Sequence, residues 1–84
     1  MPNRTLRELI EADIEQVFSL VDMAEEQAVL GNFQSGAQIL QAAEKVFADI
    51  EQRISPLSSD DASPFLPLLA ELRRAIENAR SHIQ

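Results

Sequence analysis

The side chains that most often carry chemistry are few in this sequence. His82 is the single histidine among 84 residues and there is no cysteine, so the residues can assemble neither a zinc site nor the usual pairing of a nucleophile with a base. The place of His82 near the end of a helical pattern favours a capping or surface role. Ser58, Ser59 and Ser63 stand among prolines and aspartates, which is typical of turns.

A phosphate-binding loop is also missing from the pattern. Gly31 and Gly36 lie five residues apart with no strand-like run before them, and Lys45 is too distant to complete such a loop. We therefore expect no catalytic residue, no metal ligand and no cofactor-binding residue. The sequence predicts a protein without enzymatic activity.

The charge balance excludes two classes of partner. Seven Lys and Arg stand against 14 Asp and Glu, giving a formal net charge of -7, which is the wrong sign for binding a phosphate backbone or an anionic membrane. The start of the chain lacks an apolar signal-peptide core, and no apolar run approaches the ~18 residues that a membrane span needs. We expect a cytoplasmic protein that neither binds nucleic acid nor inserts into a membrane.

Acidic residues are concentrated in the first part of the chain. Five of them recur at helical spacing and should project from one side of a helix: Glu8, Glu11, Glu15, Asp22 and Glu26. They are spread along the helix rather than converging, so neither a metal cage nor a carboxylate pair for acid/base catalysis is expected. This acidic face has two interpretations, a docking surface for a basic partner or a solvated surface that keeps a small protein soluble.

Apolar periodicity predicts an all-α, antiparallel three-helix bundle in one domain covering residues 1–84, with helices at about 5–30, 33–54 and 64–83. Thr5 and Glu8 have the spacing of a capping box, which predicts that the first helix begins near Leu6. The apolar stripe of this helix consists of Leu6, Ile10, Ile14, Val17, Val21, Ala24 and Ala28.

A very short connection should follow the first helix. Gly31 can adopt the left-handed conformation that ends a helix after Leu30, and Asn32 can cap the next helix. Such a short turn makes the two helices an antiparallel hairpin. The stripe of the second helix consists of Gly36, Leu40, Ala43, Phe47, Ile50 and Ile54.

The segment 55–64 is rich in proline, serine and aspartate and is predicted to be a loop. Ser63 as N-cap and Pro64 at the first position would start the third helix, but Pro67 would then lie at the end of its first turn. A short irregular turn before Leu66 is the alternative. The third stripe consists of Phe65, Leu68, Leu69, Leu72, Ile76, Ala79 and Ile83.

Apolar residues exceed what a narrow core-facing stripe needs. Five of them are predicted to line a groove between helices that could hold the apolar face of a partner helix: Ile39, Ala42, Val46, Leu68 and Ala75. The alternative interpretation is that wide apolar arcs touch both neighbouring helices of the bundle. Val29, Leu57 and Leu66 are further candidates for exposed apolar residues.

The predicted hairpin resembles a known repeat. Residues 20–48 match the pattern of a tetratricopeptide (TPR) hairpin, which has small, glycine, aromatic, small, bulky and alanine positions at fixed offsets. In this order the matching residues are Ala24, Gly31, Phe33, Gly36, Leu40 and Ala43. One hairpin is too short for a TPR array, which needs about three stacked repeats. Over the whole chain the layout resembles the microtubule-interacting and trafficking (MIT) domain, a three-helix bundle whose first two helices are TPR-like.

The resemblance implies an interaction module rather than an enzyme. The leading hypothesis is a protein that binds an amphipathic helix or peptide in a groove between two of its helices, with no cofactor. Two alternatives are a homo-oligomeric structural protein, in which the partner is a second copy, and an acidic decoy that occupies the basic surface of another protein.

Overall fold

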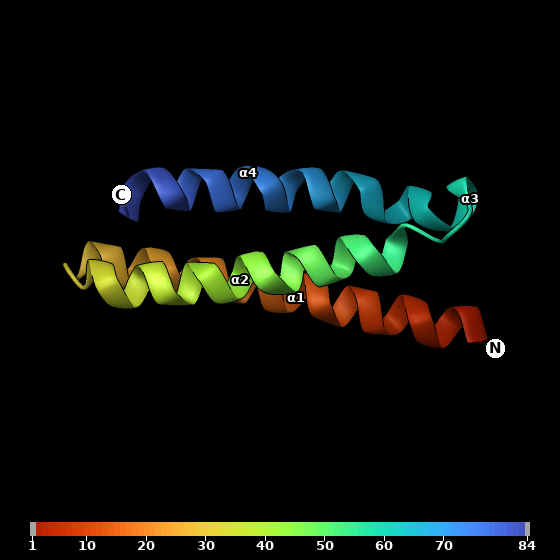
Figure 1. Ribbon diagram of the computed structural model, residues 1–84, viewed down its shortest axis with the longest axis horizontal. Helices are drawn as coiled ribbons and strands as arrows, with labels where there is room; N and C mark the ends of the chain where they lie inside the picture. Colours follow the sequence, from red (N-terminus) through yellow and green to blue (C-terminus); the bar gives the residue numbers. More distant parts are fainter. Residues whose placement is uncertain (1, 84) are drawn as a thin grey trace.

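A computed structural model describes the backbone of residues 2–83 and the side chains of residues 6–83. Its elements are α1 (Pro2–Val29), α2 (Phe33–Ile54), α3 (Ser59–Ala62), the short 3-10 helix η1 (Ser63–Phe65) and α4 (Leu66–Ile83). Figure 1 shows α1 and α2 as an antiparallel hairpin, with α4 lying along it and running antiparallel to α2. The bundle measures 45 × 18 × 15 Å. The predicted all-α three-helix architecture is confirmed.

The core is formed by the three predicted apolar stripes. Every predicted member of the α2 stripe is buried, and Ile10, Ile50 and Leu72 are fully inaccessible to solvent. Among the described side chains, no buried residue is polar or charged. Val29 and Leu66 are exposed as expected, whereas Leu57 is half-buried and packs against the core. Within residues 2–83, no helix combines the length and the apolar character that crossing a membrane requires.

The turn between α1 and α2 is a Schellman motif. Gly31 has φ of 86°, its amide donates to the Ala28 carbonyl at 3.0 Å, and the Asn32 amide donates to the Gln27 carbonyl at 2.8 Å. The predicted role of Gly31 is confirmed. Asn32 occupies the N-cap position of α2, but its side chain makes no capping hydrogen bond to that helix. Its Nδ2 donates instead to Oε1 of Gln27 at 3.1 Å.

The start of α1 differs from the prediction. The helix begins at Pro2, so Thr5 and Leu6 lie inside it rather than at its boundary. Proline is favoured in the first turn because its missing N–H would have no partner there and its φ is already helical. The Thr5 side chain, and with it the proposed capping box to Glu8, lies outside the described side chains.

The connection from α2 to α4 contains helical structure where a loop was predicted. The Ser58 Oγ accepts the Asp61 amide at 3.2 Å and caps α3. Ser63 is not an N-cap; it begins η1, so the irregular turn before Leu66 is the arrangement found. Pro67 lacks the N–H that would bind the Ser63 carbonyl in an α-helix, and the Leu66 amide binds that carbonyl instead, which makes the turn 3-10.

Candidate functional site: the groove between α2 and α4

The five residues of the predicted acidic face lie where the sequence placed them. Glu8, Glu11, Glu15, Asp22 and Glu26 are all exposed on α1. At 100° per residue they fall within an arc of about 60°. They therefore share one exposed side of α1.

The five residues of the predicted groove do not line one groove. Ile39, Val46, Leu68 and Ala75 are half-buried against the core, and Ala42 is exposed. Val46 lies two helical turns before Arg53, which pairs with Asp13 of α1, so this side of α2 faces α1.

The α4 members also turn away from α2. Ala75 lies two residues from Arg73, which points toward α2, and this spacing separates their directions by about 160°. The α2 members and the α4 members are therefore on different sides of α1. From the sequence, the apolar residues at the edges of a helical stripe can be identified, but not the neighbouring helix that each edge contacts.

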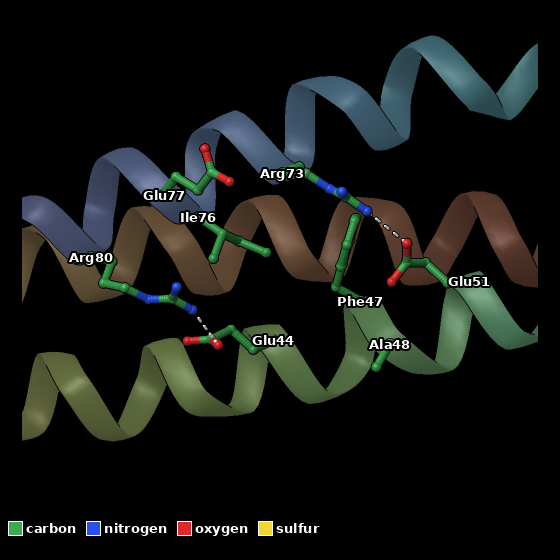
Figure 2. A pocket seen from close by; sticks show the side chains of 8 residues that line it. All are labelled: Glu44, Phe47, Ala48, Glu51, Arg73, Ile76, Glu77 and Arg80. Atoms are coloured by element: carbon green, nitrogen blue, oxygen red, sulfur yellow. Dashed lines mark hydrogen bonds and ion pairs between the residues drawn. The ribbon is translucent and has the colours of Figure 1, made fainter.

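A different groove runs between α2 and α4. It contains two adjoining hollows of about 330 and 370 Å³. The first is lined by Glu44, Phe47, Ala48, Glu51, Arg73, Ile76, Glu77 and Arg80, shown in Figure 2. The second is lined by Ala37, Leu40, Gln41, Glu44, Arg80 and Ile83.

Two ion pairs cross this groove. Arg73 Nη2 lies 2.9 Å from Oε2 of Glu51, and Arg80 pairs with Glu44 (Figure 2). The arginines are seven residues apart on α4 and the glutamates seven apart on α2, so the two pairs are separated by about 10.5 Å along the helices. The matched spacing allows both pairs to form in the same register of α4 against α2.

Apolar side chains form the floor of the groove between the ion pairs. Phe47 and Ile76 are 8% and 5% exposed, and the Arg73 guanidinium lies 5.8 Å from the centre of the Phe47 ring. Ala48 is exposed at the edge, where its small side chain leaves space for another chain. The base of the groove is thus made of largely buried apolar side chains, with charged side chains along its rims.

The lining residues of the groove are charged, aliphatic, aromatic and amide side chains. The glutamates at the two ends are engaged by arginines, and the groove contains no hydroxyl, thiol or imidazole among its lining residues. His82 is exposed in the last turn of α4, in a position that suits the helix dipole. Among residues 2–83, no three His, Asp or Glu side chains gather in a way that could hold a metal ion.

Sequence reasoning did not select Glu44, Glu51, Arg73 or Arg80. A signal was present, because two glutamates and two arginines repeat at the same seven-residue interval on helices expected to be antiparallel. Comparisons of the chain with protein-family models, curated proteins and solved structures give no match. The geometry of the groove and the MIT-like and TPR-like residue pattern are therefore the basis for a functional proposal.

Proposed function

We propose that this protein is a non-enzymatic interaction module that holds an amphipathic helix of a partner protein in the groove between α2 and α4. The observation that carries the proposal is the pair of adjoining hollows, with Leu40, Phe47 and Ile76 beneath them and charged side chains along both rims. Helix binding in a groove between two helices is also what the MIT-like layout implies. This proposal moves the predicted groove to a neighbouring seam of the bundle and keeps its mode of binding.

A helix suits this groove better than an extended peptide does. The backbone amides and carbonyls of α2 and α4 are consumed by their own helical hydrogen bonds, so they offer no row of free groups for a strand to join. A partner must therefore bind through side chains. An amphipathic helix presents apolar side chains every three or four residues along one side. Along α2, Phe47 and Ala48 are likewise three or four residues from Glu44 and from Glu51, so the groove has a similar repeat along its length.

Charge defines the polar edge of the partner helix. The first hollow is lined by three carboxylates, Glu44, Glu51 and Glu77, and by two guanidinium groups. The arginines are already paired with two of these glutamates, which leaves an excess of negative charge. We expect the partner helix to carry Lys or Arg beside its apolar stripe, because basic side chains would pair with this excess.

The test is a titration of the labelled protein with synthetic helical peptides. The probes are an amphipathic peptide with a leucine stripe flanked by lysines and a scrambled peptide of the same composition. We expect only the amphipathic peptide to shift the backbone amide signals of Ala48, Ile76 and their neighbours. Ala48→Arg should weaken this binding by about tenfold or more, because a long side chain would fill the open edge.

Ala42→Arg is the matched control, since Ala42 is an exposed alanine on another side of α2. It should leave the shifts of the groove amides unchanged. The proposal fails if the amphipathic peptide perturbs no groove amide, or if the scrambled peptide perturbs the same amides equally.

A further inference from the structure

The outer side of α1 carries a row of apolar residues that the core does not use. Leu9, Met23 and Leu30 are 52%, 49% and 70% exposed. Together with Gln16 they occur at seven-residue intervals, so they form one line along the helix. The opposite side of α1 packs in the core, where Ile10 and Val17 are completely buried. The line from Leu9 to Leu30 remains exposed to solvent.

The residues on either side of this line complete the pattern of a coiled-coil seam. If Leu9 and its repeats are a positions, the d positions are Ala12, Ser19 and Glu26. The small side chains of Ala12 and Ser19 allow close approach of a second helix, and Glu26 adds an exposed carboxylate at the third d position. The g positions, directly before each a position, include Glu15 and Asp22. All of these d and g residues are exposed.

The hairpin adds an apolar flank to the seam. On α2, the side that faces α1 carries Ile39 and Val46, which are half-buried, and Ala42, which is exposed. Arg53 on this side is paired with Asp13 of α1. The outer surface of the hairpin is thus apolar along its middle and acidic along one edge.

We propose that the outer face of α1 is a second docking site, which binds a basic amphipathic helix as a coiled coil. The apolar side chains of that helix would cover Leu9, Met23 and Leu30, and its Lys or Arg side chains would face Glu15 and Asp22. Charge complementarity selects this occupant, because α1 has seven acids and no Lys or Arg from Glu8 to Leu30. This site is independent of the proposed function of the α2–α4 groove.

A second copy of α1 is excluded as the occupant by the same charges. In an antiparallel pair g positions face g positions, so Glu15 and Asp22 would meet carboxylates. In a parallel pair they would face the e positions Asp13, Leu20 and Gln27, which carry no positive charge. A helix with Lys or Arg at its flanking positions, in contrast, can pair its charges with Glu15 and Asp22.

The experiment uses three synthetic peptides of three heptads each, the length of the line from Leu9 to Leu30. The first has leucine at a and d with lysine at e and g. The second has the same leucines with glutamate at e and g, and the third has the composition of the first in an order without heptads. Because the α2–α4 groove could bind the same leucine and lysine peptide, affinity is taken from the amide shifts along α1, in the parent protein and in the Ala48→Arg variant.

We expect only the first peptide to bind, with an affinity that falls as salt is added. The double variant Glu15→Lys, Asp22→Lys should weaken binding by about tenfold, and Met23→Ser should weaken it without changing the salt dependence. All three positions are exposed, so circular dichroism should show unchanged helix content.

Ala48→Arg, which blocks the α2–α4 groove, should leave this affinity unchanged. That control separates the two sites, because failure of the groove titration would not affect the α1 shifts. The inference is overturned if the first peptide does not bind, if either control peptide binds as tightly, or if binding ignores both the charge reversal and Met23→Ser.

Discussion

Gly36 lies at a close approach between α1 and α2. A β-carbon at this position would lie 3.0 Å from the Ala24 carbonyl oxygen and 3.5 Å from Cδ1 of Ile83. The carbonyl belongs to the backbone of a buried helix face, so it cannot move aside as a flexible side chain can. Gly36 therefore sets the spacing of the hairpin and the place where the end of α4 meets it.

Substitution of Gly36 should have an effect that depends steeply on side-chain size. Gly36→Ala should change the free energy of unfolding little, because a gain in helix propensity of about 1 kcal/mol offsets the tight contact. Gly36→Leu should lower the free energy of unfolding by about 1–3 kcal/mol, since its side chain cannot fit between the helices. Urea denaturation measures both variants.

Gln34→Leu is the control for this series, because Gln34 is exposed in the same turn of α2. It should change stability by less than about 0.5 kcal/mol. Equal stabilities for the Gly36→Leu variant and the parent protein would show that the close approach at Gly36 is not a constraint.

At the level of single residues, much of the fold was predictable. The buried positions of α2 follow directly from apolar spacing, and the left-handed Gly31 follows from the absence of a side chain. The Asn32 side chain was not predictable in the same way. It had two polar partners within reach, the backbone of α2 and the side chain of Gln27, and its sequence position does not decide between them.

At the level of elements, α4 is attached to α2 by polar contacts as well as by the core. The Arg80 and Glu44 side chains are 43% and 38% exposed, so water and salt weaken their attraction. A double-mutant cycle with Glu44→Gln and Arg80→Gln should give a coupling energy of about 0.2–1 kcal/mol at low salt. The coupling should fall at about 1 M NaCl, where the Debye length is about 3 Å.

A cycle between Glu44 and Arg73 serves as the reference, because Arg73 pairs with Glu51 two turns away. Its coupling should be close to zero. A coupling as large as that of Glu44 with Arg80 would mean that the four charges act as one cluster rather than as two separate pairs.

Prediction was weakest where several elements meet. The segment 55–64 was expected to be a loop, yet a capping serine and two prolines produce α3 and η1 within it. The apolar periodicity of a helix does not give the rotation of that helix in the bundle, which decides which of its residues line a groove. Ile39 and Leu68 have the periodicity of edge positions, and in the bundle both are half-buried against the core.

At the level of the whole molecule, exposed apolar residues also gather at the tip of the hairpin. Val29, Leu30 and Phe33 are 86%, 70% and 52% exposed. Three side chains are far fewer than the 20 to 30 residues per partner, covering about 800 Å², that a stable interface uses. A net charge of -7 also opposes association between copies.

Sedimentation equilibrium should therefore give a single species of 9.4 kDa up to high micromolar concentration. Added salt should not change this result greatly, since the apolar tip remains too small when charge repulsion is screened. A concentration-dependent dimer that Phe33→Ser abolishes would contradict the expectation and favour the self-associating alternative.

The direction of the helices has a mechanical consequence. α1 begins at one end of the bundle and α4 finishes near the other (Figure 1). Tension applied through Pro2 and Ile83 would pull the helices in shear, along their length. For α4 to slide past the hairpin, both ion pairs with α2 and the core contacts would have to break together. We therefore expect extension along the long axis to be opposed by the core contacts of all three long helices at once.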